Sequence, residues 1–173
     1  FILHSQYRTE TNFTFENLEA AHNRLERWRA VASLRWQTHD TVVDDDDKDS
    51  VGRVNGIVLS APHAALEALN DDLNTPEALV AVERAFDAIE AAPIKRLQHS
   101  ALSELIEWID DTLGLKLGAH TPDISDAQKQ IILERERARD QKDWKRSDKL
   151  RDELAEQGVY VKDTPSGVIW NKL

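Results

Sequence analysis

The feature that most constrains the fold is the helical spacing of apolar residues along the first two thirds of the chain. In the first such segment, apolar residues recur three or four positions apart, at Leu18, Ala21, Leu25, Trp28 and Ala32. This spacing predicts one long amphipathic helix from Thr14 to about Gln37, with Thr14 near its N-cap. Because a helix with an apolar stripe has to bury that stripe against a partner, the pattern indicates a helical bundle.

Two more apolar stripes supply the partners. One consists of Leu79, Val82, Phe86 and Ile89, and the other of Leu102, Leu105, Ile109 and Leu113. The first predicts a helix that Thr75 caps, with Pro76 in its first position and Pro93 at its end. The second predicts a helix from about Ile94 to Leu115.

A polar stretch, THDTVVDDDDKDSVGRVNG, separates the first two of these segments. Its four consecutive Asp residues repel one another and its glycines interrupt regular structure, so a mobile loop is predicted near residues 38–60. The run DDDDK also resembles a protease tag, although native-looking sequence continues on both sides. It is not a calcium loop: counted from Asp45, the sixth and twelfth places are Ser50 and Gly56, where the pattern requires Gly and Glu. No metal site is predicted.

The last third of the chain predicts a different kind of structure. Ser125 followed by Gln128 matches a capping box and predicts a helix that runs to about Arg139. Asp143 is the expected cap of a second helix, which stops at Gly158. The alternating residues that follow, arranged around a Pro and Gly turn, are typical of a small β-hairpin.

The expected fold is therefore mainly α, with an antiparallel helical bundle over residues 1–120 and a small α+β tail over residues 125–173. The 173 residues are 40% apolar, which is enough for a real core. With no apolar run of about 20 residues and no leader, the protein is expected to be soluble and cytoplasmic. Cysteine is absent, which excludes disulfides, thiolate zinc sites and cysteine nucleophiles within the chain. Methionine is absent even from position 1, so the sequence is expected to be a fragment of a longer product.

Charge is distributed unevenly along the chain. Residues 1–125 hold 11 Lys and Arg against 22 Asp and Glu, whereas residues 126–173 hold 11 against 10. Within residues 129–151 there are nine basic residues and five acidic ones. This local excess of positive charge suggests an anionic partner.

Trp144 lies in this basic segment with charged residues around it. At about 100° per residue, Asp148 and Arg151 share its face of the helix. Leu150 and Leu154 point elsewhere, so the Trp144 ring is predicted to be at least partly exposed. An exposed ring bordered by cations and a carboxylate is typical of single-stranded RNA recognition. The alternative is a ring that packs over a neighbouring loop.

The cations beside the ring are candidate phosphate contacts. Lys145 and Arg146 occupy the first helical turn, where the helix dipole disfavours cations but where free backbone amides favour an anion. Lys142 and Arg151 complete this set of candidates.

Four segments resemble, in order, parts of the C-terminal portion of bacterial cysteinyl-tRNA synthetase. They are SQYRTETNFTFENLEAA, LNDDLNTPEAL, ARDQKDWKRSDKLRDELAEQGV and KDTPSGVIW. The resemblance implies a bundle of the anticodon-binding type and a small C-terminal domain that reads the GCA anticodon of cysteine tRNA. It places the anticodon contacts on Arg139, Trp144, Asp148 and Asp163.

The resemblance also implies what this chain lacks. The full synthetase has a nucleotide-binding fold, two ATP-handling motifs and a zinc site, none of which has a counterpart here. No catalytic residue, metal or cofactor is therefore expected in this fragment, which should be inactive alone, and ATP and zinc are expected only in the catalytic domain. The expected partner is cysteine tRNA, with no membrane or DNA, and the expected state is a monomer.

Two other interpretations remain open. The first is a helical protein-interaction module with no RNA role, in which Trp144 anchors a partner protein. The second, a freestanding enzyme, is disfavoured because the chain shows no nucleophile and base arrangement and no metal-ligand set.

Overall fold

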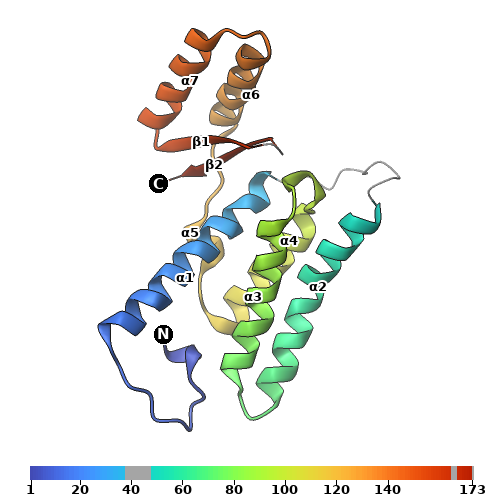
Figure 1. The fold of residues 1–173 in the computed structure, drawn as a ribbon, viewed down its shortest axis with the longest axis vertical. Coiled ribbons are helices and arrows are strands. Elements are labelled where there is room, and N and C mark those ends of the chain that lie inside the picture. The colour runs from blue at the N-terminus through green and yellow to red at the C-terminus, as the bar shows by residue number, and fades with distance from the viewer. Residues whose placement is uncertain (38–47, 165–166, 173) are drawn as a thin grey trace. The chain divides into compact units, whose positions relative to one another are not determined.

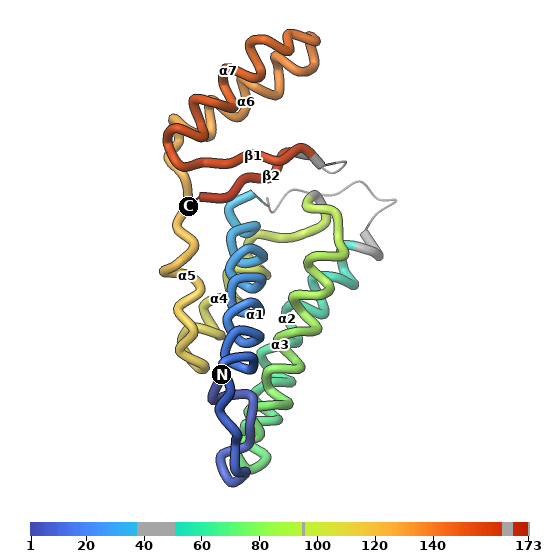
Figure 2. The backbone as a smooth tube through the Cα atoms, turned by 60° about the vertical axis from the view of Figure 1, so that its left-hand side comes forward, coloured from blue at the N-terminus to red at the C-terminus, as the bar shows by residue number. Residues whose placement is uncertain are grey.

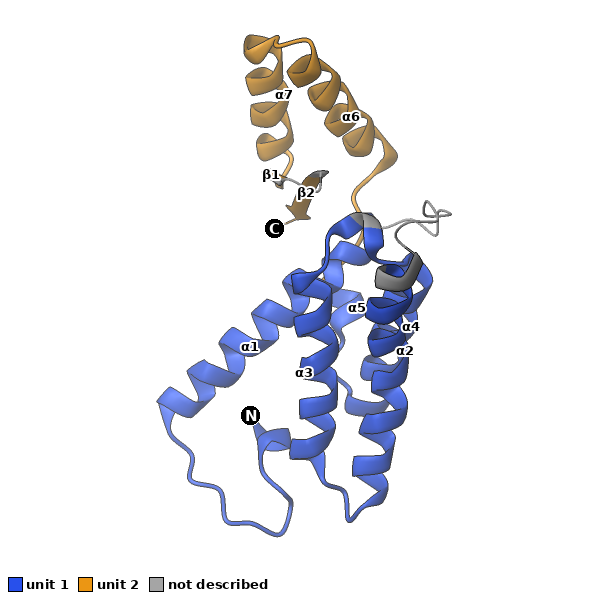
Figure 3. Ribbon diagram, turned by 45° about the vertical axis from the view of Figure 1, so that its right-hand side comes forward, with its two compact units in different colours: residues 1–120 blue, residues 121–173 orange. Residues whose placement is uncertain are grey.

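A computed structural model describes residues 1–37, 48–164 and 167–172 of the chain. The chain divides into two compact units, residues 1–120 and 121–173, which Figure 3 colours separately. The first unit is a bundle of helices, and the second joins two helices to a two-stranded sheet (Figure 1). The predicted fold class, a mainly α bundle followed by a small α+β tail, is confirmed. Within the described ranges no helix is long and apolar enough to cross a membrane.

The first long helix, α1, spans Phe15–Ser33 and is followed by the 3-10 helix Leu34–Gln37. It begins as predicted, because the Thr14 hydroxyl accepts a hydrogen bond from the backbone N–H of Asn17 at 3.1 Å. The apolar residues that it buries lie toward its C-terminal end, at Trp28, Val31 and Ala32.

The second helix, α2, spans Lys48–Asn70 and corrects one prediction. The loop predicted near residues 38–60 is wrong from Lys48 onward, where the chain is helical, and residues 38–47 lie outside the described part. The helix buries small residues three or four positions apart: Val51, Val54, Val58, Ala61, Ala65 and Ala68. Gly52, Gly56 and Pro62 have poor helix propensity, so the segment does not look helical in the sequence. Burial of the stripe stabilises the helix by more than these residues destabilise it.

The next helix, α3, spans Thr75–Ala91 and runs beside α2 in the opposite direction after a short turn (Figure 2). Its cap is Asn74, whose side chain accepts a hydrogen bond from the backbone N–H of Glu77, so the cap predicted at Thr75 is wrong by one residue. The helix α4 spans His99–Leu113 and starts later than predicted, since Ile94–Arg96 forms a separate 3-10 helix.

These helices share one hydrophobic core. Its largest fully buried side chains include Phe86, Ile89, Leu97, Leu102, Leu105 and Ile109. The ring of Trp28 stacks on that of Phe86 with 5.1 Å between the centroids. A short helix, α5 (Leu117–His120), and the 3-10 helix Ile2–His4 complete the unit.

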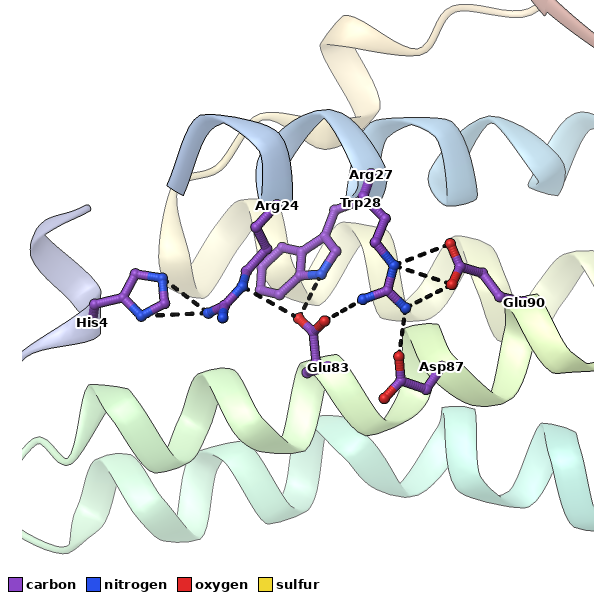
Figure 4. Close-up of polar contacts among 7 residues, drawn as sticks. All are labelled: His4, Arg24, Arg27, Trp28, Glu83, Asp87 and Glu90. Atoms are coloured by element: carbon purple, nitrogen blue, oxygen red, sulfur yellow. Dashed lines mark hydrogen bonds and ion pairs between the residues drawn. The ribbon is translucent and has the colours of Figure 1, made fainter. Parts of the chain in front are cut away.

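A cluster of ion pairs ties α1 to α3 at the edge of this core (Figure 4). Arg27 pairs with three carboxylates along one face of α3, those of Glu83, Asp87 and Glu90. Hydrogen bonds to Glu90 and Asp87 raise the pKa of Arg27 further above its already high value. Glu83 also accepts a hydrogen bond from the indole N–H of the buried Trp28 at 2.9 Å, so one carboxylate joins the ion pairs to the core.

The second unit consists of α6 (Asp126–Asp140), α7 (Trp144–Glu156), β1 (Val159–Thr164) and β2 (Gly167–Lys172). Helix α6 begins with the predicted capping box, since the hydroxyl of Ser125 and the side chain of Gln128 each bond the other's backbone N–H. The two helices lie side by side, and the strands pair antiparallel (Figure 1). The unit's buried apolar residues are Ile124, Ile132, Ala138, Leu154, Val159 and Trp170.

Candidate nucleic-acid interface

A tight turn between α6 and α7 places Trp144 beside the end of α6. The backbone N–H of Asp143 donates to the carbonyl of Ala138 at 2.8 Å, and that of Lys142 donates to the carbonyl of Arg139 at 2.9 Å. Lys142 adopts a left-handed conformation, with φ +60°. These features form a Schellman motif, which ends α6 and lets Asp143 cap α7 at once.

Trp144 is the first residue of α7 and is 55% exposed, which confirms the predicted partial exposure of its ring. The guanidinium carbon of Arg139 lies over this ring, 5.5 Å from its centroid. Such a cation–π contact holds the flexible arginine against the flat face of the indole. The two residues therefore form a preassembled surface with a planar apolar part and a positive edge.

Asp163 joins this surface from the hairpin. Val159, Val161 and Asp163 alternate along one face of β1, and Val159 at the start of that face is fully buried. The Asp163 carboxylate accepts two hydrogen bonds from Arg135, one on each oxygen, at 2.8 and 2.7 Å. A nitrogen of Arg139 lies 3.3 Å from the second of these oxygens. Asp163, Arg139 and Trp144 thus form a connected row that Arg135 anchors to α6.

The electrostatics of the row follow from these contacts. Hydrogen bonds from Arg135 lower the pKa of Asp163, burial opposes this, and the charges of Arg135, Arg139 and Arg151 lower it further. The same hydrogen bonds raise the pKa of Arg135. Asp163 is therefore ionised at neutral pH. Its side chain is 38% exposed, and each carboxylate oxygen has a second lone pair, so Asp163 can still accept a hydrogen bond from a ligand.

Arg135 is the residue that sequence reasoning missed. Its side chain is only 3% exposed, and it occupies the position between Ile132 and Ala138 on the buried face of α6. The available signal was an arginine on the apolar face of a helix, four positions before Arg139. A fully buried charge requires a partner, but the partner is 28 residues away, which no local pattern identifies.

The remaining candidates lie nearby but are not part of the row. Asp148 is well exposed on α7 and pairs with Arg151 at 3.5 Å. Arg146 pairs with Glu134 at 3.5 Å. Lys142 and Lys145 are exposed at the α6–α7 turn.

No group of three His, Cys, Asp or Glu side chains able to hold an ion occurs among the described residues. The chain has no cysteine, so the thiolate zinc site expected of the full synthetase has no ligands here.

Comparison with known protein families identifies the class of the second unit. Residues 121–170, nearly the whole second unit, match the family described as cysteinyl-tRNA ligase anticodon binding domain. The unit that carries the row of Arg135, Asp163, Arg139 and Trp144 is therefore similar to a tRNA anticodon-binding domain.

Curated relatives extend the similarity over both units. The chain is 32% identical over 182 aligned residues to a cysteine–tRNA ligase of Lactobacillus delbrueckii subsp. bulgaricus and 29% identical to one of Lachnospira eligens. Each alignment covers 99% of this chain and 37% of the relative. The resemblance to cysteinyl-tRNA synthetases indicated by the motifs is confirmed, and the chain spans little more than a third of the length of these relatives.

Proposed function

We propose that this chain is the tRNA-binding portion of a cysteine–tRNA ligase, and that its second unit binds the anticodon region of cysteine tRNA. In this proposal Trp144 stacks on an anticodon base, and Arg139 presents its fork to a guanine edge or a phosphate. Asp148 and Asp163 accept hydrogen bonds from base amino or ring N–H groups. Lys142, Lys145, Arg146 and Arg151 lie close enough along the chain to contact the backbone phosphates.

The observation that carries the proposal is the exposed Trp144 ring with the Arg139 guanidinium already held over it, in the unit that matches the anticodon-binding family. A large exposed ring costs solubility and adds little to folding, so its placement beside a cation favours a ligand with a flat face and negative charge. Single-stranded RNA supplies both features.

The rest of the reaction belongs to other parts of the full-length ligase. There, ATP would activate cysteine and zinc would select it, while this portion holds the tRNA by its anticodon end. In this proposal the catalytic residues also lie in those other parts, so aminoacylation is not expected from this chain alone. A cytoplasmic location and a monomeric state accompany the proposal.

The test is a gel shift of the 173-residue chain with cysteine tRNA and with the same tRNA carrying a scrambled anticodon loop. The proposal expects clearly tighter binding to the natural tRNA and a loss of affinity as salt rises, since phosphate contacts release counterions. Equal affinity for both RNAs would contradict anticodon recognition. A protein partner bound in a salt-insensitive way, with no RNA shift, would instead support the protein-interaction module.

A further inference from the structure

Two arginines compete for one carboxylate in the second unit. Oδ2 of Asp163 lies 2.7 Å from a nitrogen of Arg135 and 3.3 Å from a nitrogen of Arg139. Arg135 also donates a hydrogen bond to Oδ1 at 2.8 Å, so its guanidinium binds the carboxylate in a bidentate way. Arg139 makes only the one longer ion pair.

The two arginines differ in how easily they can leave Asp163. Arg135 is 3% exposed, and its Nε has no hydrogen-bond partner among the described residues, so loss of Asp163 would strand a buried charge. Arg139 is 37% exposed, and water or another anion can replace the carboxylate there. When an anion approaches the row, Arg139 is therefore the arginine that can leave Asp163 and bind the anion.

We propose that Arg135 is a positioning residue: by binding both oxygens of Asp163 it holds this carboxylate against α6 and leaves Arg139 with one longer ion pair, which a phosphate of the RNA can replace. The inference rests on the proposed function and deepens it, because it assigns a role in anticodon binding to a side chain that does not reach the RNA. Without Arg135, the carboxylate would have Arg139 as its nearest cation, and Arg139 would remain with it. Two arginines on one carboxylate also leave the trio with a net positive charge beside the exposed ring.

The test is a set of variants of the 173-residue chain, measured for binding to the anticodon stem–loop of cysteine tRNA across a salt titration. Arg139→Met should weaken binding and reduce the salt slope by about one ion. Arg135→Met should do the same, with a fall in affinity between about twofold and 100-fold. The two changes together should be no worse than either alone, because both remove the same Arg139 contact. Arg137→Met, at an exposed position of the same helix, is the matched control and should leave binding nearly unchanged.

A rescue experiment separates positioning from general support of the fold. In Arg135→Met combined with Asp163→Asn, no carboxylate retains Arg139, so the lost ion should return to the salt slope. If melting shows that Arg135→Met does not fold, Arg135→Lys takes its place and must show the same non-additivity with Arg139→Met. Additive effects, or an unchanged salt slope in the Arg135 variant, would overturn the inference alone. Absence of stem–loop binding by the unchanged chain would overturn the proposed function as well.

Discussion

Replacement of Trp144 by Ala separates a ligand-binding ring from a packing ring. Trp144 is 55% exposed, so less than half of the residue's surface is removed from water by folding. A fully buried Trp→Ala change costs about 3–5 kcal/mol, and scaling by the buried share, with no closed cavity left behind, gives about 1–2 kcal/mol for Trp144. Loss of one stacked base costs about 1–3 kcal/mol of RNA affinity, or roughly 5-fold to 150-fold in Kd. Trp144→Phe should restore part of this affinity.

The second unit contains its own matched control, because Trp170 is buried at 5% exposed. Trp170→Ala should lower the free energy of unfolding by about 3–5 kcal/mol. The assays are thermal unfolding without RNA and titration of the cysteine anticodon stem–loop at fixed salt. Trp144→Ala should change mainly the second measurement and Trp170→Ala mainly the first. If Trp144→Ala lowered the melting temperature as much as Trp170→Ala while the affinity stayed the same, Trp144 would be a packing residue and the reasoning would be refuted.

Further predictions follow from individual contacts. Lys142→Gly should stabilise the second unit by about 1 kcal/mol, because glycine adopts φ +60° without the cost that a Cβ imposes, and an unchanged melting temperature would contradict this. If Lys142 contacts a phosphate, the salt slope of RNA binding should also fall by about one ion in this variant. Glu83→Ala should destabilise the first unit by about 1–3 kcal/mol, since it leaves the indole N–H of Trp28 buried without its acceptor, and it should leave RNA affinity unchanged. The pKa of Asp163 is lowered by folding, so its contribution to stability is complete above about pH 4 and is lost as the pH falls through the lowered value. Asp163→Asn should remove that part of the acid sensitivity in melting curves, and an unchanged acid limb would contradict the assignment.

The sequence predicts most of the elements because their ends carry local chemical signals. Thr14, Ser125 and Asp143 cap the helices as expected, since a side-chain oxygen near a free backbone N–H is a short-range interaction. The whole of α2 escapes prediction: its first part is predicted to be a loop, and no helix is predicted over residues 61–70. Its stripe is made of Val and Ala, and Gly52, Gly56 and Pro62 lower the helix propensity of the segment. Tertiary burial decides the structure there, and residue propensity does not.

In the candidate site, too, local features can be predicted from the sequence and long-range contacts cannot. The exposure of Trp144 follows from the helical wheel, because its neighbours on that face are charged. The pairing of Arg135 and Asp163 depends on how a hairpin folds back on α6, and no periodicity within either segment contains that information. The long-range contact also alters the expectation for Asp163, whose two oxygens are already engaged by Arg135 before any RNA arrives.

Transfer of the anticodon tests the central claim most directly. The GCA anticodon loop of cysteine tRNA is placed on the stem of an unrelated tRNA, and the Kd of the 173-residue chain for the hybrid is measured beside the Kd for the unmodified acceptor tRNA at the same salt. The account predicts that the hybrid gains most of the affinity difference between the two natural tRNAs, and that Trp144→Ala abolishes the gain. Equal affinity for the hybrid and its parent, with cysteine tRNA still bound tightly, would show that recognition lies outside the anticodon and would contradict the account.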